Sequence, residues 1–586
     1  MPKYFLVNGK EIQDDTEIAN AFNTYYTQIG PKLAASINMP PNKSYKDYLS
    51  RPTHGTFSFK SIKCEDIINV INNLKPKSSF GADKMTNKML KILKDELNEP
   101  ITNIINQSFK TGIFPDLLKI AKVTPIYKKN ENYLLENYRP ISILPSISKV
   151  FERVMHNQIY DYFTKMNIFF TSQYGFRSRH STELAALELV DRIITEMDNN
   201  HYPVNIFMDL SKAFDTLDHQ ILLDKLAYYG FQNESLNLLT NYLSKRQQYV
   251  EINQEASKYQ EIKCGVPQGS ILGPLLFIIY MNDMPSITEY FTFIIYADDT
   301  TLFTSLCTDD TSSANITALN TELNIINDWL KVNKLSLNIE KTKAMIFHSP
   351  QKQLTLPSIS IENIKINFVD TFTFLGISID KHLKWKSHID MIARKISKAI
   401  GVLNKLKKFI PKSAMKLIYN ALVLSHMNYG LMLWGSKHGK LFKLQKKAIR
   451  ILNNSAYNAH TSPLFKIDNI LKLPDLYAAQ ESAFCYRLLN GLLPQYFTRK
   501  LLHMEITHGY QTRHAGGPRT IAVRHEFARE SISYRYPKIF NNMSALLKDK
   551  IRTHSLSGFK YYFKRTRVQS YETECYITNC YICNHT

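Results

Sequence analysis

The chain has 586 residues, of which 44% are hydrophobic, and its 73 basic side chains outnumber 51 acidic ones to give a net charge of +22. This length predicts about three or four domains, and the hydrophobic fraction excludes wholesale disorder. No apolar run approaches the length of a membrane-spanning helix, which is about 18 residues. The N-terminus lacks the basic segment followed by an apolar segment that is typical of a secretory signal. Seven cysteines are too few for a disulfide framework in a chain of this length. We therefore expect an intracellular protein, in the nucleus and cytoplasm, that is not secreted and has no membrane partner.

The positive charge is concentrated in one part of the chain. Residues 1–383 carry a net charge of −2, whereas residues 384–450 hold 16 basic side chains and a single acid, Asp390. Residues 451–586 add a further +9. This distribution predicts a polyanionic partner, nucleic acid before an acidic membrane surface, and it separates a near-neutral front part from a basic back part. A merely solvated basic surface is the alternative.

Hydrophobic periodicity predicts a mixture of helices and strands. Helical spacing occurs near residues 18–29, over 62–97, at 147–170, 182–198, 217–226 and 317–332, and in the basic segment 387–409. Strand-like patterns occur over 120–142, at 204–208, around a polar turn at 291–303, where a β-hairpin is expected, and over 342–380. The segment that follows the first helix contains Pro31, Pro40, Pro41 and Pro52 and is expected to be a linker. This order predicts an α+β fold.

Three aspartates stand at predicted strand ends. Asp209 follows the strand at 204–208, and Asp298 and Asp299 occupy the predicted hairpin turn. Unpaired carboxylates in such positions lose hydration and repel one another, so a cluster of them is best explained by bound cations. Oxygen ligands suit Mg²⁺, and two ions about 3.5–4 Å apart stabilise the attacking and leaving oxygens of a phosphoryl transfer. For an isolated Asp-Asp pair, a solvated turn is the commoner explanation.

Six segments around these aspartates carry a family resemblance. They are NYRPISILPSISKVFERV (137–154), SQYGFRSRHST (172–182), FMDLSKAFDTLDH (207–219), GVPQGSILGPLLF (265–277), YADD (296–299) and TFLGISID (373–380). In this order and spacing the chain resembles the reverse transcriptases of non-LTR retrotransposons, most closely the jockey-like type. The amino-acid sequences of the third and fourth segments fit this type better than a group II intron maturase, which shares the same palm chemistry.

The resemblance implies a metal-dependent catalytic centre. The aspartates that hold the metals in the family match Asp209, Asp298 and Asp299, and Leu210 would offer its backbone carbonyl. Two Mg²⁺ ions are expected, with Mn²⁺ as a possible substitute. The primer 3′-hydroxyl would attack the α-phosphate of a dNTP. Lys341 resembles the family lysine that protonates the leaving pyrophosphate.

The resemblance also implies a nucleotide site. Arg139 matches the arginine that grips the triphosphate, a role suited to a planar guanidinium. Phe214 matches the bulky residue that excludes a ribose 2′-hydroxyl; a core phenylalanine on a helix face is the plainer alternative. Gln268 would contact the incoming nucleotide. Lys122 would add charge there, although a surface lysine fits its sequence position equally well.

Other segments resemble parts that hold template and primer. Gly265, Pro267 and Gly269 form a loop that allows close backbone approach, while Ser270 in the same loop also fits a helix N-cap. Phe374, Leu375 and Gly376 resemble the primer-grip hairpin. Gln173, Arg177 and His180 resemble a template-contacting motif, with no chemistry implied for His180. The basic helix at 387–409 would place Arg394, Lys395 and Lys398 along phosphates.

The expected architecture is a right-hand polymerase with helical fingers, an antiparallel palm sheet backed by helices, a helical thumb and a mostly helical C-terminal region. The predicted division is a helix and linker over 1–60, left after a missing endonuclease domain, a pre-polymerase helical extension over 61–119, fingers and palm over 120–383, a thumb over 384–455, and a region of unknown role over 456–586. Cys575, Cys580, Cys583 and His585 have an unusual spacing, and we do not expect a zinc site there.

Two functions are compatible with the sequence. The first is an RNA-directed DNA polymerase whose partners are an RNA template, a DNA primer and dNTPs. The second is a catalytically inactive or co-opted nucleic-acid-binding relic of such an element. The aspartates, Arg139 and the loop at 265–270 favour the first, because a relic has no need to keep them. No protein partner is indicated.

Overall fold

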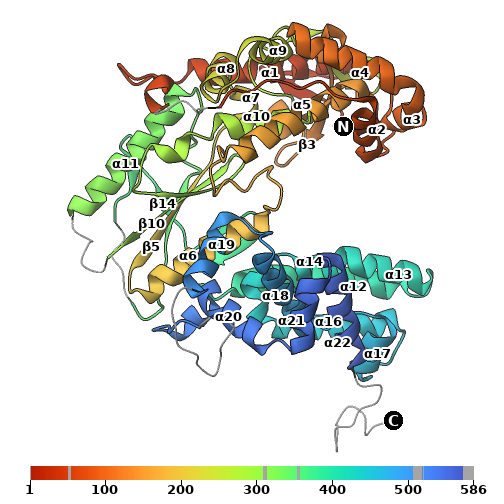
Figure 1. Ribbon diagram of the computed structural model, residues 1–586, viewed down its shortest axis with the longest axis vertical. Coiled ribbons are helices and arrows are strands. Elements are labelled where there is room, and N and C mark those ends of the chain that lie inside the picture. Colours follow the sequence, from red (N-terminus) through yellow and green to blue (C-terminus); the bar gives the residue numbers. More distant parts are fainter. Residues whose placement is uncertain are drawn as a thin grey trace, which may run out of the picture.

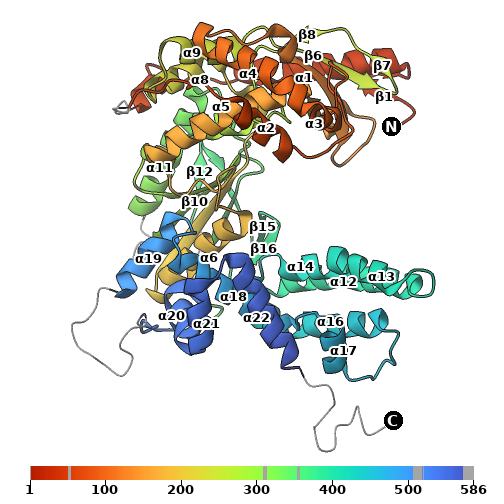
Figure 2. The same cartoon turned by 45° about the vertical axis from the view of Figure 1, so that its right-hand side comes forward.

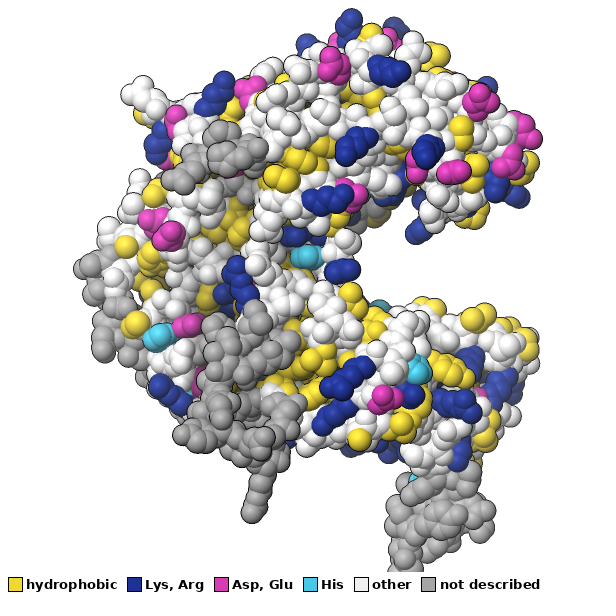
Figure 3. All heavy atoms as spheres, in the orientation of Figure 1, with side chains coloured by type: hydrophobic (Ala, Val, Ile, Leu, Met, Phe, Trp, Pro, Cys, Tyr) yellow, Lys and Arg dark blue, Asp and Glu magenta, His cyan; other side chains and the backbone are white. Residues whose placement is uncertain are grey.

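The computed structural model describes residues 2–49, 55–307, 313–352, 357–505, 518 and 520–571. The chain folds into a mixture of helices and strands, which is compatible with the predicted α+β class. The molecule is C-shaped, with an upper part that contains α1 (Asp15–Ala35) and a lower part that contains the helices from α12 (Lys386–Leu406) onward (Figure 1). Figure 3 shows an open hollow between the two parts, with Lys and Arg side chains on both sides of it.

A five-stranded sheet lies between the two parts (Figure 1). Its order is β14 (Asn367–Phe368), β11 (Lys343–Ile346), β5 (Tyr202–Met208), β10 (Asp299–Leu306) and β9 (Thr292–Tyr296). Every neighbouring pair is antiparallel except β11 and β14. The buried strand predicted at 204–208 and the hairpin predicted at 291–303 are both present, as β5 and as β9 with β10.

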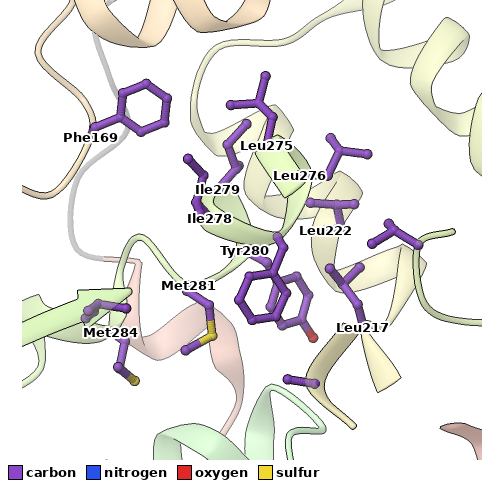
Figure 4. Packing of buried hydrophobic residues seen from close by; sticks show 14 of the residues in the cluster. Phe169, Leu217, Leu222, Leu275, Leu276, Ile278, Ile279, Tyr280, Met281 and Met284 are labelled. Carbon is purple, nitrogen blue, oxygen red and sulfur yellow. The ribbon is translucent and has the colours of Figure 1, made fainter. Parts of the chain in front are cut away.

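Each face of this sheet packs on its own hydrophobic core. On one face, Val204, Ile206 and Met208 of β5 join the core of α10 (Gly273–Tyr280) and α11 (Ser313–Val332). Figure 4 shows this packing, where Leu276 and Tyr280 of α10 lie near Leu217 and Leu222. On the other face, Phe207 joins a core that includes α6 (Thr182–Asp198) and α12. Alternation along β5 therefore fixes the sheet between two layers of helices.

A second sheet and several helices form the upper part. The sheet contains β4 (Tyr138–Ile143), β3 (Ile120–Tyr127), β6 (Gln247–Ile252) and β7 (Glu255–Ala256), and β8 (Gln260–Glu261) pairs with β6. The surrounding helices are α2 (Cys64–Asn73), α3 (Asn87–Ile92), α4 (Lys94–Thr111), α5 (Ser146–Lys165), α7 (Ala213–Thr216), α8 (His219–Tyr228) and α9 (Asn233–Leu243). Helices α2, α3, α5 and α8 and strands β3 and β4 fall in the predicted helical and strand-like segments, whereas most of α4, and α9, β6, β7 and β8, fall outside them.

Helix α1, predicted within residues 1–60, packs directly against the second sheet. Its Asn23 is fully buried and donates a hydrogen bond to the Lys258 carbonyl oxygen at 2.8 Å, while Ile18 and Phe22 join a small core with Val250 of β6. The N-terminal helix is therefore part of the folded body.

The lower part is almost wholly helical. A short hairpin of β15 (Thr371–Phe374) and β16 (Ile377–Asp380) leads into α12, which buries the predicted apolar stripe of Ile389, Ile392, Ile396, Ala399 and Leu403. The later helices include α13 (Lys412–Tyr419), α16 (Gly439–Leu452), α17 (Thr461–Ile467), α18 (Leu473–Leu489), α19 (Gln495–Glu505), α20 (Ile532–Asn542), α21 (Ala545–Thr553) and α22 (Leu556–Gln569). Figure 2 shows α16 and α17 beneath the layer of α12 and α13. Over the described residues, no helix combines the length and hydropathy that a membrane crossing requires.

Candidate active site

The register of the central sheet brings the three predicted aspartates to one edge. Thr300 of β10 lies opposite Met208 of β5, so the next residues along, Asp299 and Asp209, lie at facing strand ends. Asp298 occupies the turn between β9 and β10, because Asp299 pairs back with Tyr296. These carboxylates, 89 residues apart in sequence, are thus neighbours in space.

The backbone after Asp209 is held by the segment before β11. The Asp209 carbonyl oxygen accepts a hydrogen bond from the Asn338 amide at 2.8 Å, and Leu210 forms an isolated antiparallel bridge with Leu337. Lys341 lies on the next turn of this segment, and its Nζ is 3.8 Å from the Asp209 Oδ2. Lys341 therefore lies close to Asp209, and its predicted catalytic role remains a prediction.

A tight contact supports the Asp298 turn from behind. Ala297 has a φ of +58°, and its amide donates to the Gln173 Oε1 at 3.2 Å. The same Oε1 accepts from the Gly175 amide at 2.8 Å, and a Cβ on Gly175 would lie 2.3 Å from the Ala297 nitrogen. Gln173 is buried, so its side chain positions the turn; sequence reasoning expected it at the template and missed this role. The short Gln-x-Gly pattern is the only sequence signal for it.

The electrostatics of the cluster favour a positive ion. Partial burial, and then the charges of Asp298 and Asp209, raise the pKa of Asp299 to about 6. Burial and Asp209 raise the pKa of Asp298 as well, while Arg139 and Lys128 act in the opposite direction. A cation would relieve this repulsion.

The oxygen ligands at this sheet edge suit a divalent cation that also binds water and phosphate. Over the described ranges, no three His, Cys, Asp or Glu side chains form a group that could by itself hold a metal ion. Mg²⁺ is usually held by only one or two carboxylates together with water and substrate phosphates, so the solvent-accessible carboxylates of Asp298, which is exposed, and Asp209, which is half-buried, fit it without such a group.

Basic side chains face the carboxylates. Burial, and then the charges of Arg139, Lys129, Lys212 and Lys341, lower the pKa of Lys128. Arg139 is exposed on β4, opposite Ile126 of β3. Among these, sequence reasoning gave Arg139 and Lys341 a role and treated Lys128 as loosely aligned, but it missed Lys212, which adopts a left-handed conformation at the start of α7. Mutually repelling cations beside carboxylates form a surface suited to a polyphosphate.

Lys122 lies in a different environment. Its Nζ forms an ion pair with Glu251 on the neighbouring β6 and lies 5.0 Å from the centre of the Phe80 ring. The side chain is only 12% exposed. This geometry favours a structural role, and its predicted contact with nucleotide remains a prediction.

Phe214 is stacked beside the cluster. Its ring centre is 4.3 Å from that of Phe277 on α10, with the planes at 19°, and Phe176 meets it edge-on at 6.1 Å. The side chain is partly exposed rather than sealed in the core. This arrangement restrains the ring without burying it completely.

The loop at 265–270 packs against α7 and β4. Gly265 has a φ of +80° and Gly269 a φ of +134°, and a Cβ on Gly269 would lie 2.3 Å from the Ser142 carbonyl oxygen. Pro267 is buried, and its carbonyl oxygen accepts from the Ser270 hydroxyl at 3.0 Å. The Ser270 hydroxyl also accepts from the Gly273 amide at 3.0 Å, but the N-cap position of α10 is Leu272, so Ser270 is not the N-cap that the sequence suggested.

Gln268 points toward α7. Its Nε2 donates to the Asp215 Oδ1 at 2.7 Å. Burial raises the pKa of Asp215 to about 6, although Gln268 and Lys212 act in the opposite direction. Asp215 was not predicted from the sequence as a site residue. In the structure it fixes the side chain of Gln268, which is expected to contact the nucleotide.

The remaining predicted residues fall into two groups. Leu375 and Gly376 form the turn of the β15–β16 hairpin, and Arg394, Lys395 and Lys398 are exposed on α12. By contrast, Phe374 is buried and packs near Phe207, and the Arg177 Nη1 donates to the Phe170 carbonyl oxygen at 2.6 Å. The side chains of Phe374 and Arg177 are thus committed to packing, and their contacts with nucleic acid remain predictions. The possible zinc ligands Cys575, Cys580, Cys583 and His585 lie outside the described residues.

Comparison with known proteins identifies the segment that holds this cluster. Residues 126–379 match the family model described as reverse transcriptase (RNA-dependent DNA polymerase). These residues are a reverse transcriptase domain. They include Arg139, the three aspartates, the loop at 265–270 and Lys341, and the family in general depends on divalent metal ions.

Similarity extends beyond the reverse transcriptase domain. The chain is 28% identical over 464 residues to the probable RNA-directed DNA polymerase from transposon BS of Drosophila melanogaster, which covers 75% of this chain and 50% of that protein. It is 27% identical to the RNA-directed DNA polymerase from mobile element jockey of the same organism, covering 74% of this chain and 48% of that protein. The chain is therefore similar to jockey-type RNA-directed DNA polymerases over about three quarters of its own length, and it spans about half the length of these relatives.

Proposed function

We propose that this chain is an RNA-directed DNA polymerase that extends a DNA primer on an RNA template. The observation that carries the proposal is the meeting of Asp209, Asp298 and Asp299 at one sheet edge, beside the cations Lys128, Arg139, Lys212 and Lys341. Carboxylates repel a triphosphate, whereas a row of cations attracts it. Having both side by side suits an enzyme that joins a hydroxyl to a nucleoside triphosphate.

Asp209 and Asp298 would hold two Mg²⁺ ions, with Asp299 and the carbonyl of Leu210 as further oxygen donors. When bound, such ions activate the primer 3′-hydroxyl and neutralise charge on the departing pyrophosphate. Mn²⁺ has the same preference for oxygen ligands. The cations would orient the triphosphate, Arg139 by paired hydrogen bonds and the lysines as point charges.

Other residues would select and position the substrates. Phe214, held by Phe277, would exclude a ribose 2′-hydroxyl, and Gln268, held by Asp215, would contact the nucleotide. Lys341, 3.8 Å from Asp209, would supply a proton to pyrophosphate. Gly265, Pro267 and Gly269 would line the template base.

We interpret the central sheet as a palm, the upper helices and second sheet as fingers, and α12 with its neighbours as a thumb. The hollow between the upper and lower parts would then receive the template–primer duplex (Figure 3). Arg394, Lys395 and Lys398 are exposed on α12 and would contact its phosphates, while the Leu375–Gly376 turn would support the primer end.

The test is primer extension by the purified chain on an RNA template with dNTPs and Mg²⁺. We expect template-dependent DNA, and we expect Asp298→Asn to lower the rate by about 10²–10³-fold or more because it removes charge where the transition state needs it. Primer–template binding of this variant, measured by fluorescence anisotropy, should stay within a few-fold of wild type. Binding without any product from wild type, under conditions where a related polymerase is active, would instead support the inactive relic.

A further inference from the structure

Helix α6 joins the C-terminal helices to the back of the aspartate turn. It lies between the central sheet and the C-terminal helices (Figure 1). Two of its acidic side chains point to opposite sides: Glu188 to the segment at 172–174, and Asp191 to α19 and the start of α20. Both are almost fully buried, where an unsatisfied carboxylate is costly.

The first half of this connection runs from the turn to Glu188. Tyr174 pairs by its backbone with Ile295 at 2.7 Å, directly before the turn, and Gln173 beside it holds the Ala297 amide. The Tyr174 hydroxyl donates to one oxygen of Glu188, and the Ser172 hydroxyl donates to the other at 3.0 Å. The segment that supports the turn is therefore anchored on α6.

The second half runs from Glu188 to the C-terminal region. Arg192, one turn along α6, donates to Glu188 through Nε at 3.0 Å and lies 4.5 Å from the centre of the Tyr496 ring. The Tyr496 hydroxyl donates to the Asp191 Oδ2 at 2.6 Å. Lys500 forms an ion pair with the same carboxylate, and the Ile532 amide donates to its other oxygen at 2.7 Å.

We infer that residues Ser172, Tyr174, Glu188, Asp191, Arg192, Tyr496 and Lys500 form a brace through which the C-terminal region positions the aspartate turn. Every link is a hydrogen bond, an ion pair or a cation–aromatic contact. The links of Ser172 and Tyr174 to Glu188 are buried and those of Tyr496 and Lys500 to Asp191 are partly buried, and such contacts hold geometry more strictly there than in water. The brace assigns a structural role to the C-terminal region, whose role could not be predicted from the sequence. That the positioned turn is catalytic rests on the proposed function.

The chain offers a matched set of variants. Tyr174→Phe and Tyr496→Phe each remove one hydroxyl from the brace and keep the ring. Tyr571→Phe is the control, because the Tyr571 hydroxyl also donates to a carboxylate of the C-terminal region, Asp475 at 2.7 Å, but lies outside the brace. Asp198→Asn is a second control: this carboxylate joins the end of α6 to the amides of Arg524 and His525.

The primary measurement is hydrogen–deuterium exchange of the Ala297 amide in the full chain. We expect about fivefold to tenfold faster exchange in both brace variants, the scale of one lost hydrogen bond, and less than about twofold change in both controls. In primer extension, the brace variants should lower kcat about fivefold to tenfold and leave the KM for dNTP within about twofold, since the turn and not the nucleotide surface is disturbed.

Unchanged exchange at Ala297 in both brace variants, with native thermal unfolding, overturns the inference. The exchange measurement does not depend on enzymatic activity. An inactive wild type would therefore refute the proposed function, while the exchange rates would still show whether the brace positions the turn. If Tyr496→Phe is globally unfolded, Lys500→Gln breaks the same carboxylate contact from another residue. Faster exchange in the controls to the same extent would show general loosening and would also overturn it.

Discussion

The Phe214 ring lies flat against the Phe277 ring, with 4.3 Å between their centres. Phe214 belongs to α7, beside the aspartates, and Phe277 to the buried face of α10. The stack leaves Phe214 little freedom to move away from a bulky sugar. Steric exclusion of a ribose 2′-hydroxyl requires a ring that is held in place in this way.

We expect Phe214→Val to relax sugar selectivity. The ratio of kcat/KM for dNTP over NTP should fall about tenfold to 200-fold, the range for a changed contact with one small group. Single-nucleotide incorporation on an RNA template measures it. Phe277→Leu keeps the Phe214 ring and should have a smaller effect. An unchanged ratio in Phe214→Val would show that Phe214 is only a packing residue.

The raised pKa of Asp299 predicts a pH-dependent cost of folding. In the folded chain this pKa is about 6, above the ordinary value of about 3.9, so ionising Asp299 disfavours the fold. Without metal, its contribution should be absent at low pH and become destabilising as pH rises from about 4 to about 6. We expect Asp299→Asn to raise the Tm of the metal-free protein at pH 7.

The matching control is Asp370→Asn, an exposed aspartate paired with Lys381 at 2.7 Å outside the cluster, which should not raise the Tm. Mg²⁺ should stabilise wild type more than Asp299→Asn in calorimetry. A lower Tm for Asp299→Asn would mean that Asp299 makes a favourable contact and not a repulsive one.

Lys341 should act on the chemical step. Its Nζ is 3.8 Å from Asp209; the Lys341 side chain is largely exposed and that of Asp209 about half exposed, so the pair adds little stability. Lys341→Met should lower kcat about 10²-fold, the lower scale of general acid catalysis, and change the Tm little. Lys341→Arg keeps the positive charge, but a guanidinium does not readily release a proton. Full activity in Lys341→Met would exclude the proton-donor role.

Two lysines near β3 provide an internal comparison. Lys128 is surrounded by other cations near Asp298, whereas Lys122 is paired with Glu251. Lys128→Met should raise the KM for dNTP about tenfold by loss of one phosphate contact, whereas Lys122→Met should leave KM within about twofold and lower the Tm. The reverse pattern would support the sequence-based assignment of Lys122 to the nucleotide.

Exposed cations on α12 should set the salt dependence of binding. Replacing Arg394, Lys395 and Lys398 together with alanine should reduce the slope of log K against log salt by up to about three, without changing sequence preference. Anisotropy with an RNA–DNA duplex at several salt concentrations measures this. Lys110→Ala on α4 serves as the control. An unchanged slope in the triple variant would place the duplex elsewhere.

The sequence predicted those features that depend on local pattern. The strand before Asp209, the Asp298 hairpin and the apolar stripe of α12 follow from alternation and helical spacing, and the structure confirms them. Features that depend on distant contacts were not predictable. The Gln173 side chain accepts a hydrogen bond from the Ala297 amide, and Lys122 forms an ion pair with Glu251. Local sequence patterns could not predict these contacts, because each partner is more than a hundred residues away in the sequence.

Strand β3 shows that the folding unit exceeds the segment recognised by similarity. The family match begins at residue 126, near the end of this strand, whereas residues 120–123 pair in parallel with 247–250 of β6. A fragment that starts at residue 126 would expose the edge of β6 and also lose the cover of α1. Bare, apolar strand edges pair with other chains. Such a fragment, whether cloned or produced by a truncated copy of the gene, is expected to aggregate.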